Sequence, residues 1–277
     1  MTDLDRFIAL AETDANVLAI GTEGSSNNPN THPDAWVDLD VTLFVADPTA
    51  TDGNWWIHQV GSPTLVQHLA NEALFGASSS VWDTYLTRYP GTRRIDLKVA
   101  PATDIAGYLA ADSLNGLVWR RGSGRQTPTT DASSHWVAVP DQTALDACAN
   151  EFYWCLGNAV KGVARHNLVY ANEMLNRYTR PMLIDMLGFR ATAQRHGQFD
   201  AGVCGKYTWE TLTAAEQQAL AATYNQADLT GITASIRACL DLFTPVYQDV
   251  MALTGLAPMP HLATAQAQFR DWLAELA

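Results

Sequence analysis

The segment from Asp38 to Val45 alternates polar and apolar side chains, and this pattern most constrains how the chain can fold. β-Branched and apolar residues follow one another here without a helical period, so the segment predicts a β-strand. Because side chains on a strand alternate between its two faces, Asp38 and Asp40 are expected on one side and Leu39 and Val41 on the other. Two carboxylates therefore stand together at the start of a strand.

A second alternating strand is predicted over residues 94–99, with Arg94, Asp96 and Lys98 on one face. Carboxylates held close together repel each other unless a cation lies between them, and three carboxylates on strands are the usual complement of a two-metal phosphoryl-transfer site. We therefore expect Asp38, Asp40 and Asp96 to hold Mg²⁺. The alternative is that Asp38 and Asp40 are solvated residues at the mouth of a strand.

Upstream, the apolar run from Val17 to Gly21 leads into Glu23-Gly-Ser-Ser26, which predicts a strand that ends in a tight turn. Gly24 would let the backbone approach a ligand closely, and Ser25 offers a hydroxyl and an amide to phosphate oxygens. A lone Gly-Ser pair has no predictive value. Followed after twelve residues by Asp-x-Asp on a strand, it resembles the signature of the nucleotidyltransferase superfamily.

The composition limits the classes of function. The chain has 277 residues, 47% of them hydrophobic and 17% charged, which predicts a substantial core. A net charge of -12 argues against a non-specific nucleic-acid binder and suits a cationic small molecule, although solubility explains the acidity equally well. The acidic N-terminus, the absence of a long apolar run and four cysteines without zinc spacing predict a cytoplasmic protein that is not inserted in a membrane.

The chain changes character at a segment rich in Gly, Ser, Thr and Pro, residues 122–135, which predicts a linker. Before it, strands and helices alternate, with a loop expected at residues 76–80 and a last edge strand at 116–119. After it, apolar residues recur at helical spacing, with a bend or break expected at Pro181. We therefore predict domains at residues 1–135 and 136–277. The tryptophans at 55, 56, 82 and 119 are expected in the core.

Beyond the superfamily signature, the chain carries a series of motifs, in order Glu23-Gly-Ser25, Asp38-x-Asp40, Arg94-Ile-Asp96-Leu, Asn150-Glu-Phe152, Lys161-Gly162 followed by Arg165, and Gly205-Lys206-Tyr207. In these motifs, the chain resembles the aminoglycoside 6-adenylyltransferases, which modify streptomycin, from residue 4 to about residue 255. The resemblance implies an α+β fold, in which a nucleotidyltransferase domain with a mixed sheet flanked by helices precedes an all-α helical-bundle domain.

The resemblance also implies a reaction, in which ATP donates AMP to an antibiotic hydroxyl with the help of two Mg²⁺ ions, and pyrophosphate leaves. Ser25 would contact a terminal phosphate, Asp38 and Asp40 would hold magnesium, and Asp96 would complete the metal site or assist deprotonation. One departure is Ser26, where the family usually has Arg. Losing that cation could weaken triphosphate binding, or another basic residue could replace it.

In the helical half, the resemblance gives Glu173 the role of an acid that takes the hydroxyl proton. The alternative is an exposed i,i+4 ion pair with Arg177. Lys161 and Lys206 would clamp phosphates, although an isolated lysine is more often simply solvated.

The expected partners are ATP and a cationic small-molecule acceptor, with no nucleic acid and no membrane, and the expected form is a monomer. Two other functions stay open. The first is nucleotidyl transfer to a protein or RNA, and the second is a catalytically degenerate, nucleotide-binding member of the family.

Overall fold

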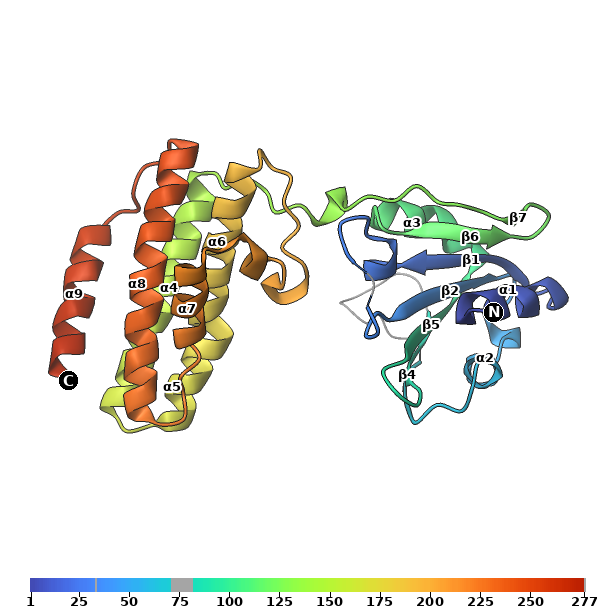
Figure 1. Ribbon diagram of the computed structural model, residues 1–277, viewed down its shortest axis with the longest axis horizontal. Helices are drawn as coiled ribbons and strands as arrows, with labels where there is room; N and C mark the ends of the chain where they lie inside the picture. The colour runs from blue at the N-terminus through green and yellow to red at the C-terminus, as the bar shows by residue number, and fades with distance from the viewer. Residues whose placement is uncertain (33, 71–81, 277) are drawn as a thin grey trace. The chain divides into compact units, whose positions relative to one another are not determined.

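The computed structural model describes residues 1–32, 34–70 and 82–276, in two compact units, Met1–Ser134 and His135–Ala277. The loop expected at residues 76–80 lies outside the described residues. One sheet organises the described part of the first unit (Figure 1). Its strands are β1 (Val17–Glu23), β2 (Leu39–Val45), β3 (Leu65–Leu69), β4 (Asp83–Arg88), β5 (Arg94–Pro101), β6 (Gly116–Arg120) and β7 (Gly124–Arg125).

The sheet is mixed, as expected. Its order is β3-β4-β5-β2-β1-β6-β7. The central pair, β2 and β5, is parallel, and the other pairs of strands described in the sheet are antiparallel. The expectation that residues 116–119 form an edge strand is wrong, because β6 pairs with β7 through Trp119 and Arg125.

Helices cover the two faces of the sheet unequally. Helices α1 (Asp3–Thr13) and α2 (Gly53–Gln59) share one hydrophobic cluster with the odd-numbered side chains of β2 and β5. On the opposite face, α3 (Ile105–Ala111) packs Tyr108 against Phe44, with ring centroids 5.0 Å apart. The polar side chains at the start of β2 and β5 therefore lie on the face that carries the smaller cluster.

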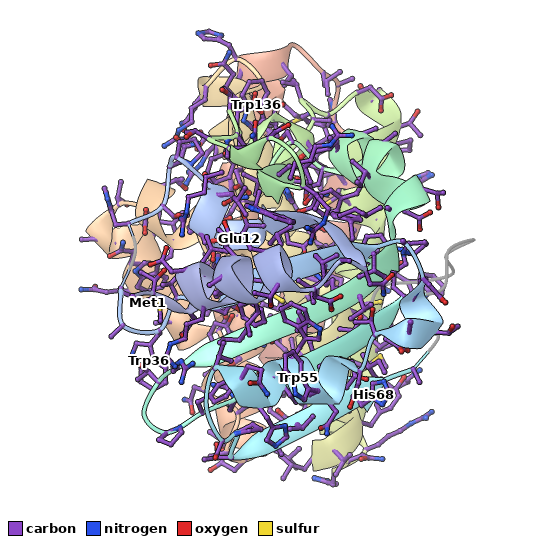
Figure 2. The ribbon with its side chains drawn as sticks, turned by 90° about the vertical axis from the view of Figure 1, so that its right-hand side faces the viewer. Met1, Glu12, Trp36, Trp55, His68 and Trp136 are labelled. Atoms are coloured by element: carbon purple, nitrogen blue, oxygen red, sulfur yellow. The ribbon has the colours of Figure 1, made fainter. Side chains whose placement is uncertain are left out.

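A capping box marks the start of α1. Thr2 and Asp5 form a capping box, in which each side chain accepts a hydrogen bond from the other residue's backbone amide. Trp56 is buried and stacks on Phe7, with ring centroids 6.2 Å apart. Trp55, also expected in the core, is 47% exposed, and Figure 2 labels it. A helix as short as α2 buries one face only, so neighbouring residues cannot both point inward.

The expected linker has structure of its own. Its first part turns back as β7, and the hydroxyl of Thr130 donates to the carbonyl of Asn27 at 2.7 Å. Ser113 Oγ donates to the carbonyl of Asp131 at 2.6 Å. These hydrogen bonds attach residues 122–131 to the first unit.

The second unit is all-α in its described part, apart from short 3₁₀ and π turns and one isolated β-bridge. Its helices are α4 (Gln142–Ala164), α5 (Leu168–Met174), α6 (Arg180–Gln194), α7 (Ala214–Ala222), α8 (Leu229–Thr254) and α9 (Leu262–Glu275) (Figure 1). Asp141 caps α4 and Asp228 caps α8, each accepting from a backbone amide three residues on. The core centres on Phe152 and Phe243, which stack with ring centroids 3.7 Å apart. No described helix of either unit is long and apolar enough to cross a membrane.

Pro181 neither breaks nor ends its helix. Helices α5 and α6 are joined by a π-helical turn, Leu175–Thr179, and Pro181 lies in the first turn of α6. A proline ring clashes with the carbonyl four residues before it, and the wider turn relieves that clash. The hydroxyl of Thr179 also donates to the carbonyl of Met174 at 3.1 Å, within the π-helical turn.

Candidate active site

A row of carboxylates crosses three neighbouring strands of the sheet. Glu23 on β1 lies opposite Asp40 on β2, and Asp40 lies opposite Asp96 on β5. Side chains that are opposite each other in register stand on the same face. Three acids from distant parts of the sequence therefore lie side by side on the face that carries the smaller cluster.

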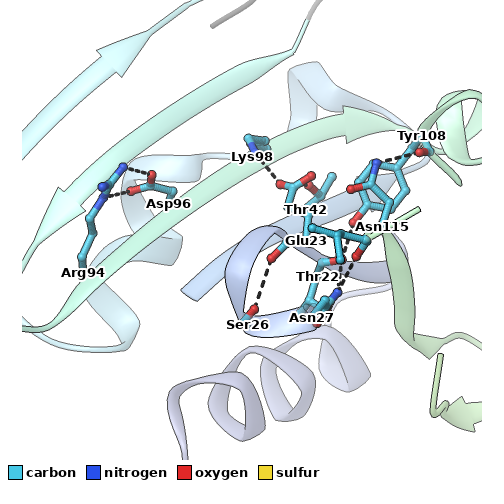
Figure 3. Close-up of polar contacts among 11 residues, drawn as sticks. Thr22, Glu23, Ser26, Asn27, Thr42, Arg94, Asp96, Lys98, Tyr108 and Asn115 are labelled. Carbon is cyan, nitrogen blue, oxygen red and sulfur yellow. Dashed lines mark hydrogen bonds and ion pairs between the residues drawn. The ribbon is translucent and has the colours of Figure 1, made fainter. Parts of the chain in front are cut away.

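Arg94 joins two of the predicted site residues. Its Nε donates to Asp96 Oδ1 at 3.0 Å, and its Nη1 lies 3.2 Å from Asp38 Oδ2. Figure 3 shows the two parallel contacts between Arg94 and Asp96. A guanidinium that bridges two carboxylates cancels part of their mutual repulsion and fixes both side chains.

A second ion pair occupies the neighbouring part of this face. Lys98 Nζ contacts Glu23 Oε1, and the hydroxyl of Thr42 donates to the same carboxylate oxygen at 3.2 Å (Figure 3). Both side chains of the ion pair are mostly buried. Glu23 is therefore held by a lysine from β5 and a threonine from β2, so the three central strands are tied together through polar side chains.

Asp40 differs from its neighbours, because its carboxylate has no hydrogen bond or ion pair to any residue that the structure describes. Burial raises the pKa of Asp40 to about 7, the ammonium of Lys98 opposes the rise, and the carboxylates of Asp38, Glu23 and Asp96 add to it. A partly buried carboxylate without a partner, beside three others, is electrostatically suited to bind a cation.

The turn above the acids passes close to Asp40 and is anchored through Asn27. Gly24 has φ +71°, and a Cβ at this position would lie 2.7 Å from Asp40 Oδ2, so any other residue would be strained and would displace the Asp40 carboxylate. The turn Gly24–Asn27 is fixed where Asn27 Nδ2 donates to the carbonyls of Thr22 and Leu114, both at 2.8 Å (Figure 3). The backbone therefore passes close to Asp40 in a fixed conformation.

The two serines of the turn differ in exposure. Ser25 is half-buried, and its carbonyl accepts from the hydroxyl of Thr31 at 2.8 Å. Ser26 is exposed, and its hydroxyl donates to the carbonyl of Glu23 at 3.1 Å. Position 26 thus supplies a local hydrogen bond and no cation, whereas Lys98 supplies a cation on the acidic face.

The carboxylates of Asp38, Asp40 and Asp96 are suitable ligands for a hard divalent cation, but two of them are engaged in ion pairs. Within residues 1–32, 34–70 and 82–276, no three His, Cys, Asp or Glu side chains are grouped so that they could hold a metal ion. Two of the carboxylates, Asp38 and Asp96, contact Arg94 instead. Carboxylate oxygens are the ligands that Mg²⁺ prefers, and the unpartnered Asp40 is the member of the set that is open to a cation.

The other predicted site residues lie in the second unit. Glu173 Oε2 lies 2.5 Å from Arg177 Nε in an exposed i,i+4 ion pair, which is the contact that the alternative interpretation predicts. Lys161 Nζ donates to Asn158 at 2.9 Å, and Lys206 Nζ lies 4.8 Å from the ring centroid of Tyr207. Both lysines are exposed. These three side chains have partners within the unit, and none of them belongs to the acidic row.

Sequence reasoning did not assign roles to Glu23, Arg94 and Lys98. The alternation of β5 places Arg94, Asp96 and Lys98 on one face, so the sequence does indicate that Arg94 and Lys98 lie beside Asp96. The contact of Lys98 with Glu23 cannot be predicted from the sequence, because it depends on how β1, β2 and β5 pair.

The model of the streptomycin adenylyltransferase family matches residues 2–269 of this chain. The chain belongs to that family. The nucleotidyltransferase class expected from the sequence is thereby confirmed, and the family implies a nucleotide co-substrate.

Similar proteins include the aminoglycoside 6-adenylyltransferases of Campylobacter jejuni and Bacillus subtilis (strain 168). The first is 27% identical over 249 residues, covering 89% of this chain and 86% of that protein. The second is 26% identical over 243 residues, covering 87% of this chain and 86% of that protein. A crystal structure of an aminoglycoside 6-adenyltransferase from Bacillus subtilis superposes with a TM-score of 0.49 at 21% identity, covering 100% of this chain and 98% of that chain.

Proposed function

We propose that this member of the streptomycin adenylyltransferase family transfers AMP from ATP to a hydroxyl group of a streptomycin-like aminoglycoside, with release of pyrophosphate. The observation that carries the proposal is the placement of Asp40 opposite Asp96 on the parallel pair β2 and β5, directly beneath the Gly24 turn. The names of the similar proteins, which match over most of their length, support an aminoglycoside as the acceptor.

Asp38, Asp40 and Asp96 would hold the Mg²⁺ ions. Magnesium bound there would neutralise charge on the α-phosphate and the leaving pyrophosphate. Arg94 would then have to release Asp38 and Asp96, because its guanidinium occupies the oxygens that a metal would use. The salt bridge thus keeps the acids of the free enzyme close together.

The backbone of Gly24 and the hydroxyl of Ser25 would bind phosphate oxygens, because the turn is fixed and open to a close approach. Lys161 and Lys206 would add positive charge for the phosphates. Glu173 would accept the proton of the acceptor hydroxyl, and for this its ion pair with Arg177 must open. Asp96 is the other candidate for the base.

The second candidate function is nucleotidyl transfer to an acceptor of another class, RNA or protein. The net charge of -12 disfavours RNA, whose phosphates need clustered Lys and Arg. A protein acceptor and a degenerate, merely nucleotide-binding protein are separated from the first proposal by the experiment below. We propose that the enzyme acts as a monomer on a small cation.

The experiment measures pyrophosphate release from ATP and Mg²⁺ with a panel of aminoglycosides, and separately with RNA and with unrelated proteins as acceptors. We expect release with streptomycin-like compounds only. Asp40→Asn should abolish it, since a bound metal ion supplies several kcal/mol of charge stabilisation to the transition state, which corresponds to about 10²-fold or more in rate. Asp47→Asn is the matched control, because Asp47 is an exposed acid whose carboxylate accepts hydrogen bonds from Thr49. Release that needs RNA or protein would replace the aminoglycoside proposal.

A further inference from the structure

The second unit contains a cavity of about 580 Å³, whose lining residues all belong to that unit. It lies between the π-helical turn, helix α6 and the loop at residues 201–205. This volume is in the range of small-molecule sites. Gly205 has φ +72°, and a Cβ at this position would lie 2.3 Å from a methyl group of Ile184, so the loop can approach α6 this closely only with glycine.

Arg180 builds one side of the cavity and is 4% exposed. Its Nε donates to Thr223 Oγ1 at 3.1 Å, its Nη2 to the carbonyl of Thr223 and its Nη1 to Asn176 Oδ1. The guanidinium also stacks over the ring of Tyr224, with its Cζ 3.9 Å from the centroid. Arg180 therefore fixes two other lining side chains, Asn176 and Tyr224, and is itself engaged on several sides.

Asp185 lines the same cavity. Across the described parts of the chain, its carboxylate has no hydrogen bond and no ion pair. The side chain is open to solvent, yet nearby protein atoms remove enough water to raise the pKa of this carboxyl. A carboxylate that lines a cavity in this way attracts a cationic group, and an ion pair would offset the free energy that desolvation costs the ionised form.

The remaining lining groups suit a sugar. Asn176 Oδ1 accepts a hydrogen bond from Arg180, and Asn176 Nδ2 has no partner among the residues described, so this amide nitrogen can donate to a hydroxyl oxygen. Tyr224 and Phe189 offer aromatic surface for the apolar face of a ring. The set combines one carboxylate, one free amide donor and aromatic walls, which matches a hydroxyl-rich molecule that carries a basic group.

We propose that this cavity binds the aminoglycoside acceptor, with Asp185 pairing with an amino or guanidinium group of the ligand. This inference rests on the proposed function and names the residue of the helical unit that selects a cationic acceptor. Asp185 attracts the basic group, Asn176 donates to a hydroxyl, and Arg180 acts as a positioning residue that holds Asn176 and Tyr224.

The test measures streptomycin binding by calorimetry for the full-length chain, in the presence and absence of ATP and Mg²⁺. Asp185→Asn should weaken streptomycin binding by about 10- to 100-fold, as expected for the loss of a hydrogen bond to a charged group. Asp185→Glu should recover part of the affinity, and the affinity for ATP with Mg²⁺ should stay unchanged. Since Asp185 is exposed and forms no hydrogen bond or ion pair with a described residue, these variants should fold normally.

Asp241→Asn is the matched control. Asp241 is also an exposed acid on a long helix, and it lines a separate hollow of about 480 Å³, where Arg237 and Arg270 accompany it. Its replacement should leave streptomycin binding unchanged.

The outcomes separate this inference from the proposed function. Streptomycin binding that is equally strong in wild type and Asp185→Asn overturns the inference and leaves the proposed function intact. If Asp185→Asn weakens the binding of ATP and not the binding of streptomycin, the inference is also overturned, and the cavity is a nucleotide site. If the wild-type chain binds no aminoglycoside at low salt, the proposed function fails and this inference fails with it.

Discussion

Asp40 lies directly opposite Asp96 in the parallel pairing of β2 with β5, and the two carboxylates have different partners. Asp96 accepts two hydrogen bonds from Arg94, whereas Asp40 accepts none from any residue that the structure describes. The difference follows from position, because Arg94 precedes Asp96 by two residues on the same face of β5. One acid is thus held by the protein, and the other is left for a ligand.

The first prediction concerns the stability of the enzyme without metal as a function of pH. The pKa of Asp40 is about 7 in the folded protein against 3.8 for an ordinary aspartate, so the folded state keeps a proton that the unfolded state has lost. Stability therefore falls as pH rises from about 4 to about 7. Asp40→Asn removes this loss, so the variant should gain stability over wild type as pH increases, measured by urea unfolding.

Asp47→Asn is a control of opposite sign. Hydrogen bonds from Thr49 lower the pKa of Asp47, so this carboxylate stabilises the folded state above the ordinary aspartate pKa and the stabilisation is lost as pH falls. Its variant should lose stability relative to wild type at neutral pH. If the difference in unfolding free energy between wild type and Asp40→Asn does not change with pH, Asp40 has the pKa of an ordinary aspartate.

The second prediction concerns Arg94. Arg94→Met leaves Asp38 and Asp96 without their cation, so it should destabilise the metal-free protein by about 1–3 kcal/mol. Because Mg²⁺ would supply the missing charge, millimolar Mg²⁺ should raise the Tm of Arg94→Met more than that of wild type. Differential scanning fluorimetry with and without Mg²⁺ measures both effects.

Arg93→Met provides the comparison for Arg94. Arg93 also forms an ion pair, with Asp3 at 2.6 Å, but its guanidinium lies over Tyr89 and away from the acidic row. This variant should be destabilised without recovery by Mg²⁺. Equal Mg²⁺ effects on both variants would argue against a metal site at Asp38 and Asp96.

The third prediction separates backbone strain from the close approach at Gly24. Gly24→Ala forces a Cβ into the left-handed region, at a cost of about 1–2 kcal/mol, and pushes against Asp40. Turnover should fall by about 10²-fold, as expected when a catalytic group is displaced by about 1 Å. Gly91→Ala has a similar φ of +80° but open space around the new Cβ, so it should cost stability and leave the rate unchanged. Equal rates for both variants would contradict the role of Gly24.

The fourth prediction decides between two roles of Glu173. As a general base, it must be ionised, and Glu173→Gln should lower kcat by about 10²- to 10⁴-fold with little change in acceptor binding. Arg177→Ala removes the other half of the ion pair and should leave kcat near that of wild type. If single-turnover kinetics give the same small effect for both variants, Glu173 only stabilises the surface of its helix and Asp96 becomes the candidate base.

Local patterns were enough to predict much of the fold. The alternation over residues 38–45 and 94–99 predicts which side chains of β2 and β5 face the core, because the period of a strand is two residues. Thr2 marks the start of α1 because its hydroxyl caps the helix. Both inferences need only residues that are close in sequence.

The partners of the site residues could not be predicted in the same way. The contact of Arg94 with Asp38 depends on the register between β2 and β5, which are more than forty residues apart. The cavity beside Asp185 brings together residues from the π-helical turn, α6 and the segment near Tyr224, and no periodicity reveals such a meeting. The π-helical turn itself arises from how Pro181 is accommodated, which propensity alone does not determine.

Adenylyl transfer is detected in the mass of streptomycin after incubation with the purified chain, ATP and Mg²⁺. We predict a product that is heavier by one adenylyl group and forms together with an equal amount of pyrophosphate. Asp40→Asn and Asp96→Asn, verified as folded, should yield none. If the folded wild-type chain leaves streptomycin and related aminoglycosides unmodified under conditions in which ATP binds, the protein is not an aminoglycoside adenylyltransferase.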